Sequence, residues 1–256
     1  MKAATNKFRL SLRVDQGAFG PVFSGKIAGG KTKVAIKRRD PYSMHSEHEF
    51  HTEIEMSSKI LHHNFVPLVG YCDEMGEMIL VYNYMAHGCL RDHLYRTKQP
   101  PLTWNRRLEI CIGAARGLHS LHTSQIIHGN VNTKKILLNE KWVAKITDLS
   151  LPKSLPLTEV SRMPILLAGC ARPILDHKLP KQQLVLVAWA LRCKVEGNLD
   201  QIVDPCLKGS INQRSLETFV GIAEKCLASE GIHRPSMGDV LLYLELALRA
   251  QGTVQG

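Results

Sequence analysis

The chain has 256 residues, of which 44% are hydrophobic and 22% are charged, and its formal net charge is +10. This composition excludes an intrinsically disordered chain and allows one large or two-lobed domain with a sizeable core. The positive charge suits a solvated basic surface or, second, a nucleotide or an acidic protein partner. We expect no nucleic acid partner, because no nucleic-acid-binding motif accompanies the charge.

The cysteines and the apolar windows indicate the compartment. The seven cysteines are scattered and form no Cys-x-x-Cys pair, which argues against a disulfide framework or a zinc site and favours a reducing compartment. The most apolar windows, PILLAGCARPIL and LVLVAWAL, fall short of the ~18 apolar residues that a membrane span needs. The sequence therefore predicts a soluble, cytoplasmic chain without a membrane span.

The N-terminal part is predicted to be a small sheet with one helix. Residues 8–36 alternate apolar and polar positions in GPVFSGKI and TKVAIK, with a Gly29-Gly30 hairpin turn between them. Residues 46–61 fit a helix, and FVPLVGYC and MILVYNYM fit two further strands joined by the acidic turn DEMGE. The inward stripe of the predicted helix consists of Phe50, Ile54, Ser57 and Leu61.

From Gly88 onward the pattern is mainly helical. The stretch LTWNRRLEICIGAARGLHSLH is long and amphipathic, and Thr103 can serve as its N-cap. Two short apolar runs, KILLN and WVAKIT, follow it. Three closing helices are predicted at 182–195, 213–228 and 236–250.

Six motifs occur in the order and spacing of the protein-kinase signature set: VDQGAFGPVFSG, VAIK, EFHTEIEM, ILVYNYM, IIHGNV and DLS. The chain therefore resembles the plant receptor-like Ser/Thr kinases, and GEMILVYNYMAHGCLRDHLY and PLTWNRRLEICIGAARGLHSLHT resemble the malectin-type, FERONIA-like subgroup. The resemblance covers nearly the whole chain. It implies an α+β, two-lobed protein-kinase-like fold, with an N-lobe at 1–84 and a truncated helical C-lobe at 85–256.

The resemblance assigns phosphate and metal contacts to three residues. Lys37 matches the lysine that holds the α- and β-phosphates of ATP, and Glu53 matches its ion-pair partner on the helix. Glu55 competes for the second role, but the helical stripe favours Glu53 as the inward-facing acid. Asp148 matches the metal-binding aspartate.

The adenine site of the resembled family is also retained. Tyr82 stands at the gatekeeper position, and the hinge follows it. Each residue of this site could equally be plain core. The adenine-contacting positions are Val22, Ala35, Leu137, Asn83 and Met85.

The glycine-rich loop departs from the family pattern. A kinase carries G-x-G-x-x-G, whereas this chain carries Asp15 in place of the first glycine and keeps Gly17 and Gly20. A carboxylate at this position would lie close to polyphosphate, so we expect it to oppose nucleotide binding.

The catalytic loop departs further. Asn130 stands at the catalytic aspartate position, and an amide cannot accept the proton of a substrate hydroxyl. Asn132 replaces the phosphate-steadying lysine, and Gly129 replaces an arginine. Lys135 stands at the second metal-ligand position. This leaves three outcomes: the metal is absent, Lys135 swings away, or Lys135 contacts phosphate in place of the metal.

The resemblance also predicts a deletion. No Pro-Glu dipeptide follows Asp148, so the A-P-E block that closes an activation segment is missing, and we place the break near 155–165. Arg234 of HRPSM matches the arginine that pairs with the lost glutamate. It should therefore be exposed or have a new partner.

Two functions from different classes follow. The first is a pseudokinase, a scaffold or regulator with weak or lost ATP binding and doubtful Mg²⁺ binding. The alternative is an active ATP-dependent Ser/Thr kinase, and a third possibility is a decayed chain that does not fold stably. The expected partners are proteins, including an active receptor-like kinase at the inner face of the plasma membrane.

Overall fold

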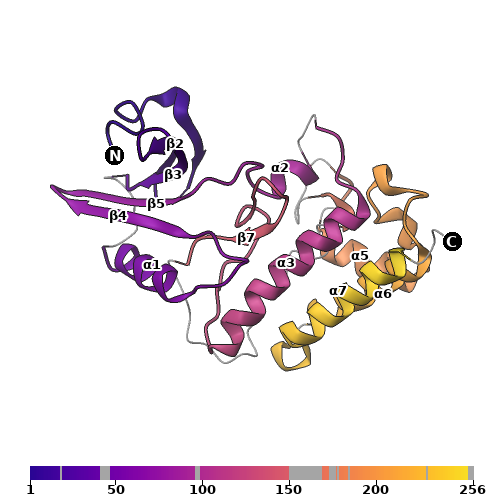
Figure 1. Cartoon of the computed structure of the whole chain (residues 1–256). Helices are drawn as coiled ribbons and strands as arrows, with labels where there is room; N and C mark the ends of the chain where they lie inside the picture. Colours follow the sequence, from indigo (N-terminus) through magenta and orange to yellow (C-terminus); the bar gives the residue numbers. More distant parts are fainter. Residues whose placement is uncertain are drawn as a thin grey trace.

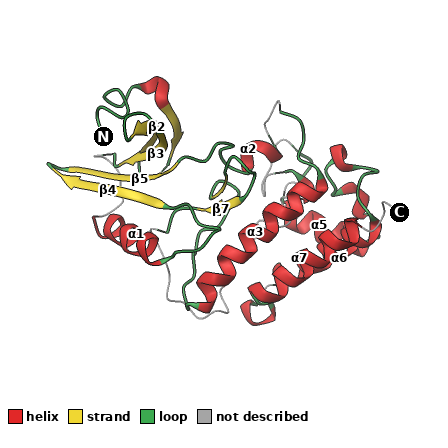
Figure 2. Cartoon of the chain, in the orientation of Figure 1, coloured by secondary structure: helices red, strands yellow, loops and turns green. Residues whose placement is uncertain are grey.

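The structure is a computed structural model, and it describes residues 1–17, 19–40, 47–95, 99–149, 169–172, 177, 179–183, 185–228 and 230–252. A sheet with one helix forms the N-terminal part, and a mainly helical part follows (Figure 1; Figure 2). This arrangement confirms the expected α+β, two-lobed kinase-like fold. The predicted deletion site near 155–165 lies outside the described residues.

The N-lobe is an antiparallel sheet of five strands in the order β1-β2-β3-β5-β4. The predicted hairpin turn lies between β2 and β3, where Gly29 and Gly30 have φ of 65° and 88°. Glycine adopts this left-handed conformation without a Cβ penalty. The strands are Arg13–Gln16 (β1), Pro21–Ile27 (β2), Thr32–Arg38 (β3), Leu68–Glu74 (β4) and Glu77–Asn83 (β5).

An N-terminal segment covers part of this sheet. Residues 1–9 lead into the short 3₁₀ helix η1 (Leu10–Leu12), and the N–H of Lys26 in β2 donates to the Ala4 carbonyl at 3.2 Å. The Phe8 ring meets Phe23 of β2 edge-on, with 5.4 Å between ring centroids. Backbone pairing and aromatic packing thus hold the segment against β2.

Helix α1 (Glu47–Lys59) buries Phe50 and Glu53. The predicted stripe is wrong at its end, because the helix stops at Lys59 and Leu61 is 93% exposed. The apolar spacing continued past the last helical turn, so periodicity alone placed Leu61 inside.

The C-lobe is built around α3 (Trp104–Thr123), whose N-cap is Thr103 as predicted. The Thr103 hydroxyl accepts a hydrogen bond from the Arg106 N–H at 3.3 Å. The remaining elements are α2 (Arg91–Leu94), β6 (Ile136–Leu138), β7 (Ala144–Ile146), α5 (Leu186–Val195), η3 (Leu199–Gln201), η4 (Pro205–Leu207), α6 (Gln213–Cys226), η5 (Gly231–His233) and α7 (Met237–Gly252).

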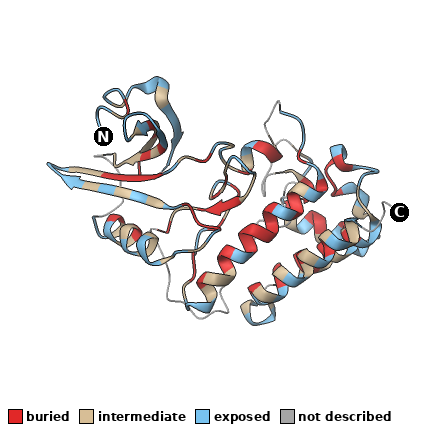
Figure 3. Cartoon of the chain, in the orientation of Figure 1, coloured by how far each residue is buried: buried red, intermediate tan, exposed pale blue. Residues whose placement is uncertain are grey.

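Helix α3 is buried along most of its length, and α7 lies beside it (Figure 3). Its small residues allow a close approach to β7. A Cβ atom added at Gly117 would lie 2.8 Å from the Cδ1 atom of Ile146, so no larger residue fits without a shift. The close packing fixes the β6–β7 hairpin, and therefore the loops at its ends, against the central helix.

A buried ion pair joins α3 to the segment before η4. The Arg107 side chain is 1% exposed, and its Nη2 donates to Asp204 Oδ2 at 2.5 Å. Its Nε also donates to the Leu102 carbonyl at 3.0 Å.

Elsewhere in the C-lobe, Arg234 is half-buried and its Nε donates to the Ala228 carbonyl at 2.9 Å. Arg234 has therefore found a new partner, as expected.

Candidate functional site

Lys37 and Glu53 meet between the sheet and α1. The Lys37 Nζ lies 2.8 Å from Glu53 Oε2 and 3.0 Å from Oε1. The Glu53 side chain is 1% exposed, whereas Glu55 is exposed and pairs with Lys59. The inward-facing acid is therefore Glu53, as the helical stripe suggested.

Asp148 completes a group that we call the four-charge cluster: Lys37, Glu53, Lys135 and Asp148. The Lys37 Nζ lies 3.3 Å from Asp148 Oδ1, and the Lys135 Nζ forms an ion pair with Asp148 Oδ2. Two ammonium groups thus face two carboxylates, and the formal charges of the cluster cancel. Lys135 therefore lies directly against the carboxylate at the metal-binding position.

The cluster is shielded enough to perturb Lys135. Burial, and then the nearby Lys37 ammonium, lower the pKa of Lys135 to about 8, while Glu53 and Asp15 oppose this shift. Asp15, at the first-glycine position, therefore contributes to the field at Lys135. At neutral pH Lys135 remains charged, and it places a positive charge at the carboxylate that a kinase uses for metal binding.

Tyr82 adds a contact that the sequence analysis missed. Its hydroxyl donates to Glu53 Oε1 at 2.6 Å, so Glu53 is held by both the lysine and the tyrosine. Burial, followed by the Glu53 carboxylate, raises the pKa of Tyr82 well above its ordinary value. The tyrosine therefore stays neutral and donates a charge-assisted hydrogen bond.

Phe19, at the tip of the glycine-rich loop, was also missed. Its side chain is only 3% exposed, and its ring stacks near Phe50 of α1 with 6.2 Å between centroids. The Lys37 Nζ lies 4.9 Å from the centre of the Phe19 ring. The loop tip is therefore folded inward, onto Lys37. In the sequence, the aromatic residue between Gly17 and Gly20 was the feature that could have indicated this inward position.

The loop backbone supports this inward position. The Gly17 N–H donates to the Gly20 carbonyl at 3.1 Å, and the Asp40 N–H donates to the Phe19 carbonyl at 2.9 Å. A Cβ added at Gly20 would lie 2.1 Å from the Arg38 carbonyl oxygen. Only glycine fits there, because its φ of 153° and the close backbone leave no room for a side chain.

The predicted adenine contacts lie around one apolar cluster. Ala35 and Leu137 are half-buried and pack against the cluster that contains Phe19, Tyr82 and Met85. In β2, the half-buried Val22 pairs with Lys37 across the sheet.

The two hinge residues already make backbone contacts within the protein. The Asn83 N–H donates to the Pro67 carbonyl at 3.1 Å, and the Met85 carbonyl accepts from the Gly88 N–H at 3.2 Å. These bonds occupy the Asn83 N–H and one of the two lone pairs of the Met85 carbonyl.

The segment at the catalytic-loop position is a turn that is closed by hydrogen bonds among its own residues. The Asn132 Nδ2 donates to the Asn130 carbonyl at 3.2 Å, while Asn132 Oδ1 accepts from the Lys134 N–H at 2.9 Å. Gly129 has φ of 75°, a conformation that suits glycine better than the arginine of the family.

Buried His128 anchors this turn. Its Nε2 lies 3.0 Å from the Thr147 carbonyl, and burial lowers its pKa. Because its Nδ1 faces the Asn130 N–H at 3.4 Å, the ring fits the neutral tautomer with the proton on Nε2.

Among the described residues, no three His, Cys, Asp or Glu side chains gather as a metal site, and no helix is both long and apolar enough to cross a bilayer. A cavity of about 360 Å³ lies in the C-lobe, lined by Tyr95, Arg107, Cys170 and Asp204 among others. None of the four-charge cluster lines that cavity.

Comparisons with known proteins assign the family. The family model described as "Protein tyrosine and serine/threonine kinase" matches residues 8–164. Among curated relatives in Arabidopsis thaliana, the receptor-like protein kinase FERONIA is 47% identical over 290 residues, which cover 100% of this chain and 32% of FERONIA. The receptor-like protein kinases ANXUR1 and THESEUS 1 are each 46% identical, covering 100% and 98% of this chain and 34% and 33% of their own lengths.

The chain spans about a third of the length of these relatives. The FERONIA alignment of 290 positions exceeds the 256 residues of this chain by 34, so that number of positions has no residue here. With the ordered motifs, the kinase-like fold and the family match together, the chain belongs to the protein tyrosine and serine/threonine kinase family, with FERONIA-like receptor-like kinases as its relatives.

Proposed function

We propose that this chain is a pseudokinase, a kinase-fold scaffold or regulator that does not transfer phosphate. The observation that carries the proposal is the ion pair between Lys135 and Asp148. An ammonium group lies on the carboxylate that would ligate Mg²⁺, at the position where a second metal ligand would stand. Phosphoryl transfer depends on metal positioning and electrostatics, so this substitution removes its main support.

Mg²⁺ does not fit the residues present. Both Asp148 oxygens contact ammonium groups, Oδ1 that of Lys37 and Oδ2 that of Lys135. Mg²⁺ requires near-octahedral oxygen coordination and is repelled by a neighbouring cation. No step of the proposed function therefore involves a metal.

ATP fits only in part. The residues proposed for its adenine end are Val22, Ala35, Leu137, Asn83 and Met85. At the phosphate end, Gly17 and Gly20 keep the loop, but Phe19 lies on Lys37 and must be displaced. We therefore infer weak ATP binding, or none, with Lys37 and Lys135 as the cations available to phosphate.

The residues at the two catalytic positions, Asn130 and Asn132, support the same proposal. Asn130 cannot act as a base, and the amide of Asn132 already donates to the Asn130 carbonyl. We infer that the lobes are residues 1–84 and 85–256, and that the missing alignment positions fall near 155–165, where a substrate-docking platform would lie. In this proposal the chain lacks a catalytic base, a bound metal and a substrate-docking platform, so the function that remains is binding to another protein.

The proposed partner is another protein, in particular an active receptor-like kinase. The relatives named above are receptor-like kinases. A chain that keeps their fold can bind an active kinase as another kinase domain would, without catalysing phosphate transfer itself. Through such a partner the chain would lie at the inner face of the plasma membrane, in the cytoplasm.

A phosphotransfer assay tests the proposal. Radiolabel from γ-labelled ATP should reach neither the chain itself nor a generic protein substrate above the level of a Lys37→Ala control. Asn130→Asp alone should remain inactive, because Lys135 still holds Asp148. Turnover in the parent chain would favour the active-kinase alternative, and a cooperative unfolding transition would separate both from a chain that does not fold.

A further inference from the structure

The C-lobe cavity of about 360 Å³ has no part in the proposed function. It lies where α2, the N-terminal part of α3 and the segment around η4 meet. Two of its lining residues, Gln99 and Cys206, are exposed, so the cavity can be reached from solvent. Its volume lies at the small end of the roughly 300–1,000 Å³ that is usual for ligand sites. The space therefore suits a small molecule.

The charged groups that line the cavity do not cancel. Arg107 and Asp204 neutralise each other in their ion pair, and Arg172 adds a second guanidinium. Burial raises the pKa of the Cys170 thiol to about 12, so this lining residue stays neutral near neutral pH. With histidine neutral, the described lining therefore carries one excess positive charge.

Arg172 is the source of that excess. Among the described residues no carboxylate forms an ion pair with it, although the residue is half-buried. A charge that is shielded from water is unfavourable unless an opposite charge pairs with it. In the sequence, Arg172 is also the one charged residue of the apolar window PILLAGCARPIL. An anion in the cavity would supply the partner that the chain lacks.

The Arg172 side chain is held in place before any ligand binds. Its guanidinium carbon lies 4.4 Å from the centre of the Trp189 ring in α5, and its Nη2 donates to the Gln183 carbonyl at 3.2 Å. A guanidinium carries five N–H groups in a planar fork that matches the two oxygens of a carboxylate. Because the fork is already ordered, a carboxylate would bind it at a reduced entropic cost.

Another part of the lining is apolar and consists of Leu94, Pro101, Ile202 and Val203. Leu94, Ile202 and Val203 are each 8% exposed or less. A bare inorganic anion would leave this wall uncovered, whereas an apolar body attached to the anionic group would remove it from water. A single cationic anchor beside an apolar wall is the composition typical of small-molecule sites.

We propose that this cavity binds a small organic carboxylate, with Arg172 pairing with the carboxylate group and the apolar body covering Ile202 and Val203. The proposal does not depend on the proposed pseudokinase function, because no residue of the four-charge cluster lines the cavity. A ligand bound there stabilises the folded chain by mass action.

Calorimetry of the whole chain with 2-naphthoate as the probe tests the proposal. The parent should bind 2-naphthoate at least about tenfold more tightly than neutral 2-naphthamide, which lacks the charge, or inorganic phosphate, which lacks the apolar body. Arg172→Gln should weaken 2-naphthoate binding about tenfold or more, the usual contribution of hydrogen bonds to a charged group.

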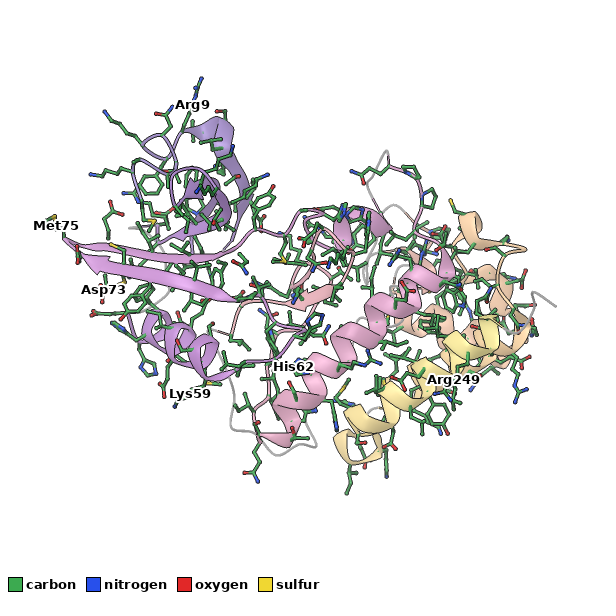
Figure 4. The ribbon with its side chains drawn as sticks, viewed as in Figure 1. Arg9, Lys59, His62, Asp73, Met75 and Arg249 are labelled. Carbon is green, nitrogen blue, oxygen red and sulfur yellow. The ribbon has the colours of Figure 1, made fainter. Side chains whose placement is uncertain are left out.

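Two control variants remove the same charge outside the cavity. Arg192→Gln loses a comparable hydrogen bond, because the Arg192 Nη2 donates to the Gln182 carbonyl at 3.1 Å. Arg249→Gln removes an exposed guanidinium from α7 (Figure 4). Neither residue lines the cavity, so both variants should bind 2-naphthoate like the parent. No binding by the parent, equal binding of 2-naphthamide or phosphate, or an equal loss in the controls would overturn the proposal.

Thiol labelling of the parent gives a result that does not require Arg172→Gln to fold. Cys206 is exposed and lines the cavity, whereas Cys72 in β4 is half-buried and lies outside it. Saturating 2-naphthoate should slow the reaction of Cys206 with iodoacetamide severalfold and leave that of Cys72 unchanged, as measured by mass spectrometry of the peptides. An unchanged rate at Cys206 would place the probe elsewhere and would also overturn the proposal.

Discussion

Lys135 is the residue on which the proposal for the phosphate end of the site rests. Its ammonium contacts Asp148, and its pKa is lowered to about 8 by burial and by the charge of Lys37. Kinase chemistry needs a divalent cation at this carboxylate. Here a side chain supplies a monovalent cation, fixed in the chain and present without nucleotide.

The lowered pKa of Lys135 predicts a pH dependence of stability. The folded-state pKa of about 8 lies below the ordinary 10.5, so between these values the unfolded chain binds more protons. The free energy of unfolding contributed by this group therefore rises with pH across that window. Denaturant titrations from pH 7.5 to 10 should show the parent gaining stability relative to Lys135→Met.

The neighbouring Lys134 provides the control, because it is exposed. Lys134→Met should follow the parent closely over the same pH range, because the Lys134 charge has a smaller effect on the pKa of Lys135 than burial and Lys37 have. If the difference between the parent and Lys135→Met is flat or falls with pH, the burial argument for Lys135 is wrong.

Of the elements around the site, the glycine-rich loop has the arrangement that is least favourable for binding a nucleotide. Phe19 packs beside Phe50 and over Lys37, so ATP must displace the ring before its phosphates reach the lysine. Phe19→Ala should therefore strengthen ATP binding severalfold. It should also destabilise the chain by about 3 kcal/mol, the order expected for a buried Phe→Ala change.

Phe8→Ala is the matched control for that experiment. Phe8 packs on Phe23 and beneath the Arg38 guanidinium, in a different cluster from Phe19. It should lower stability with no change in ATP affinity. Calorimetry of all three chains separates the effects, and unchanged affinity in Phe19→Ala would mean that the ring does not obstruct nucleotide.

The elements of regular structure were predictable because their signals are local. Thr103 caps α3, and the glycine pair turns the β2–β3 hairpin, as their side-chain chemistry requires. Helix ends depend on what the next residues contact, so Leu61 was placed inside the N-lobe although it is 93% exposed. The Phe19 position and the Tyr82–Glu53 hydrogen bond depend on residues distant in sequence, which no periodicity reports.

On the scale of the whole molecule, the C-lobe core is tied together by the Arg107–Asp204 ion pair. The guanidinium is 1% exposed, so removing it leaves a buried carboxylate without this partner. Arg107→Ala should lower the free energy of unfolding by about 3–5 kcal/mol.

Arg106→Ala, one residue away, removes a largely exposed pair with Glu109 and should cost less than about 1 kcal/mol. Chemical denaturation measures both variants. Equal losses would show that burial does not set the difference.

The central claim is that Lys135 takes the place of a metal ligand and of the metal's charge. The most direct test is a titration with ATP, with and without Mg²⁺, in which binding is followed by the thermal shift of the chain. The parent should respond only at high nucleotide, since stabilisation grows from about 0.4 kcal/mol at the dissociation constant to about 2.7 kcal/mol at a hundredfold excess. Its response should be the same with and without Mg²⁺. Lys135→Asn should bind ATP at least about tenfold more tightly with Mg²⁺ than without it, because it restores an oxygen ligand and removes the opposing charge. Tight, strictly Mg²⁺-dependent binding by the parent chain would contradict the account.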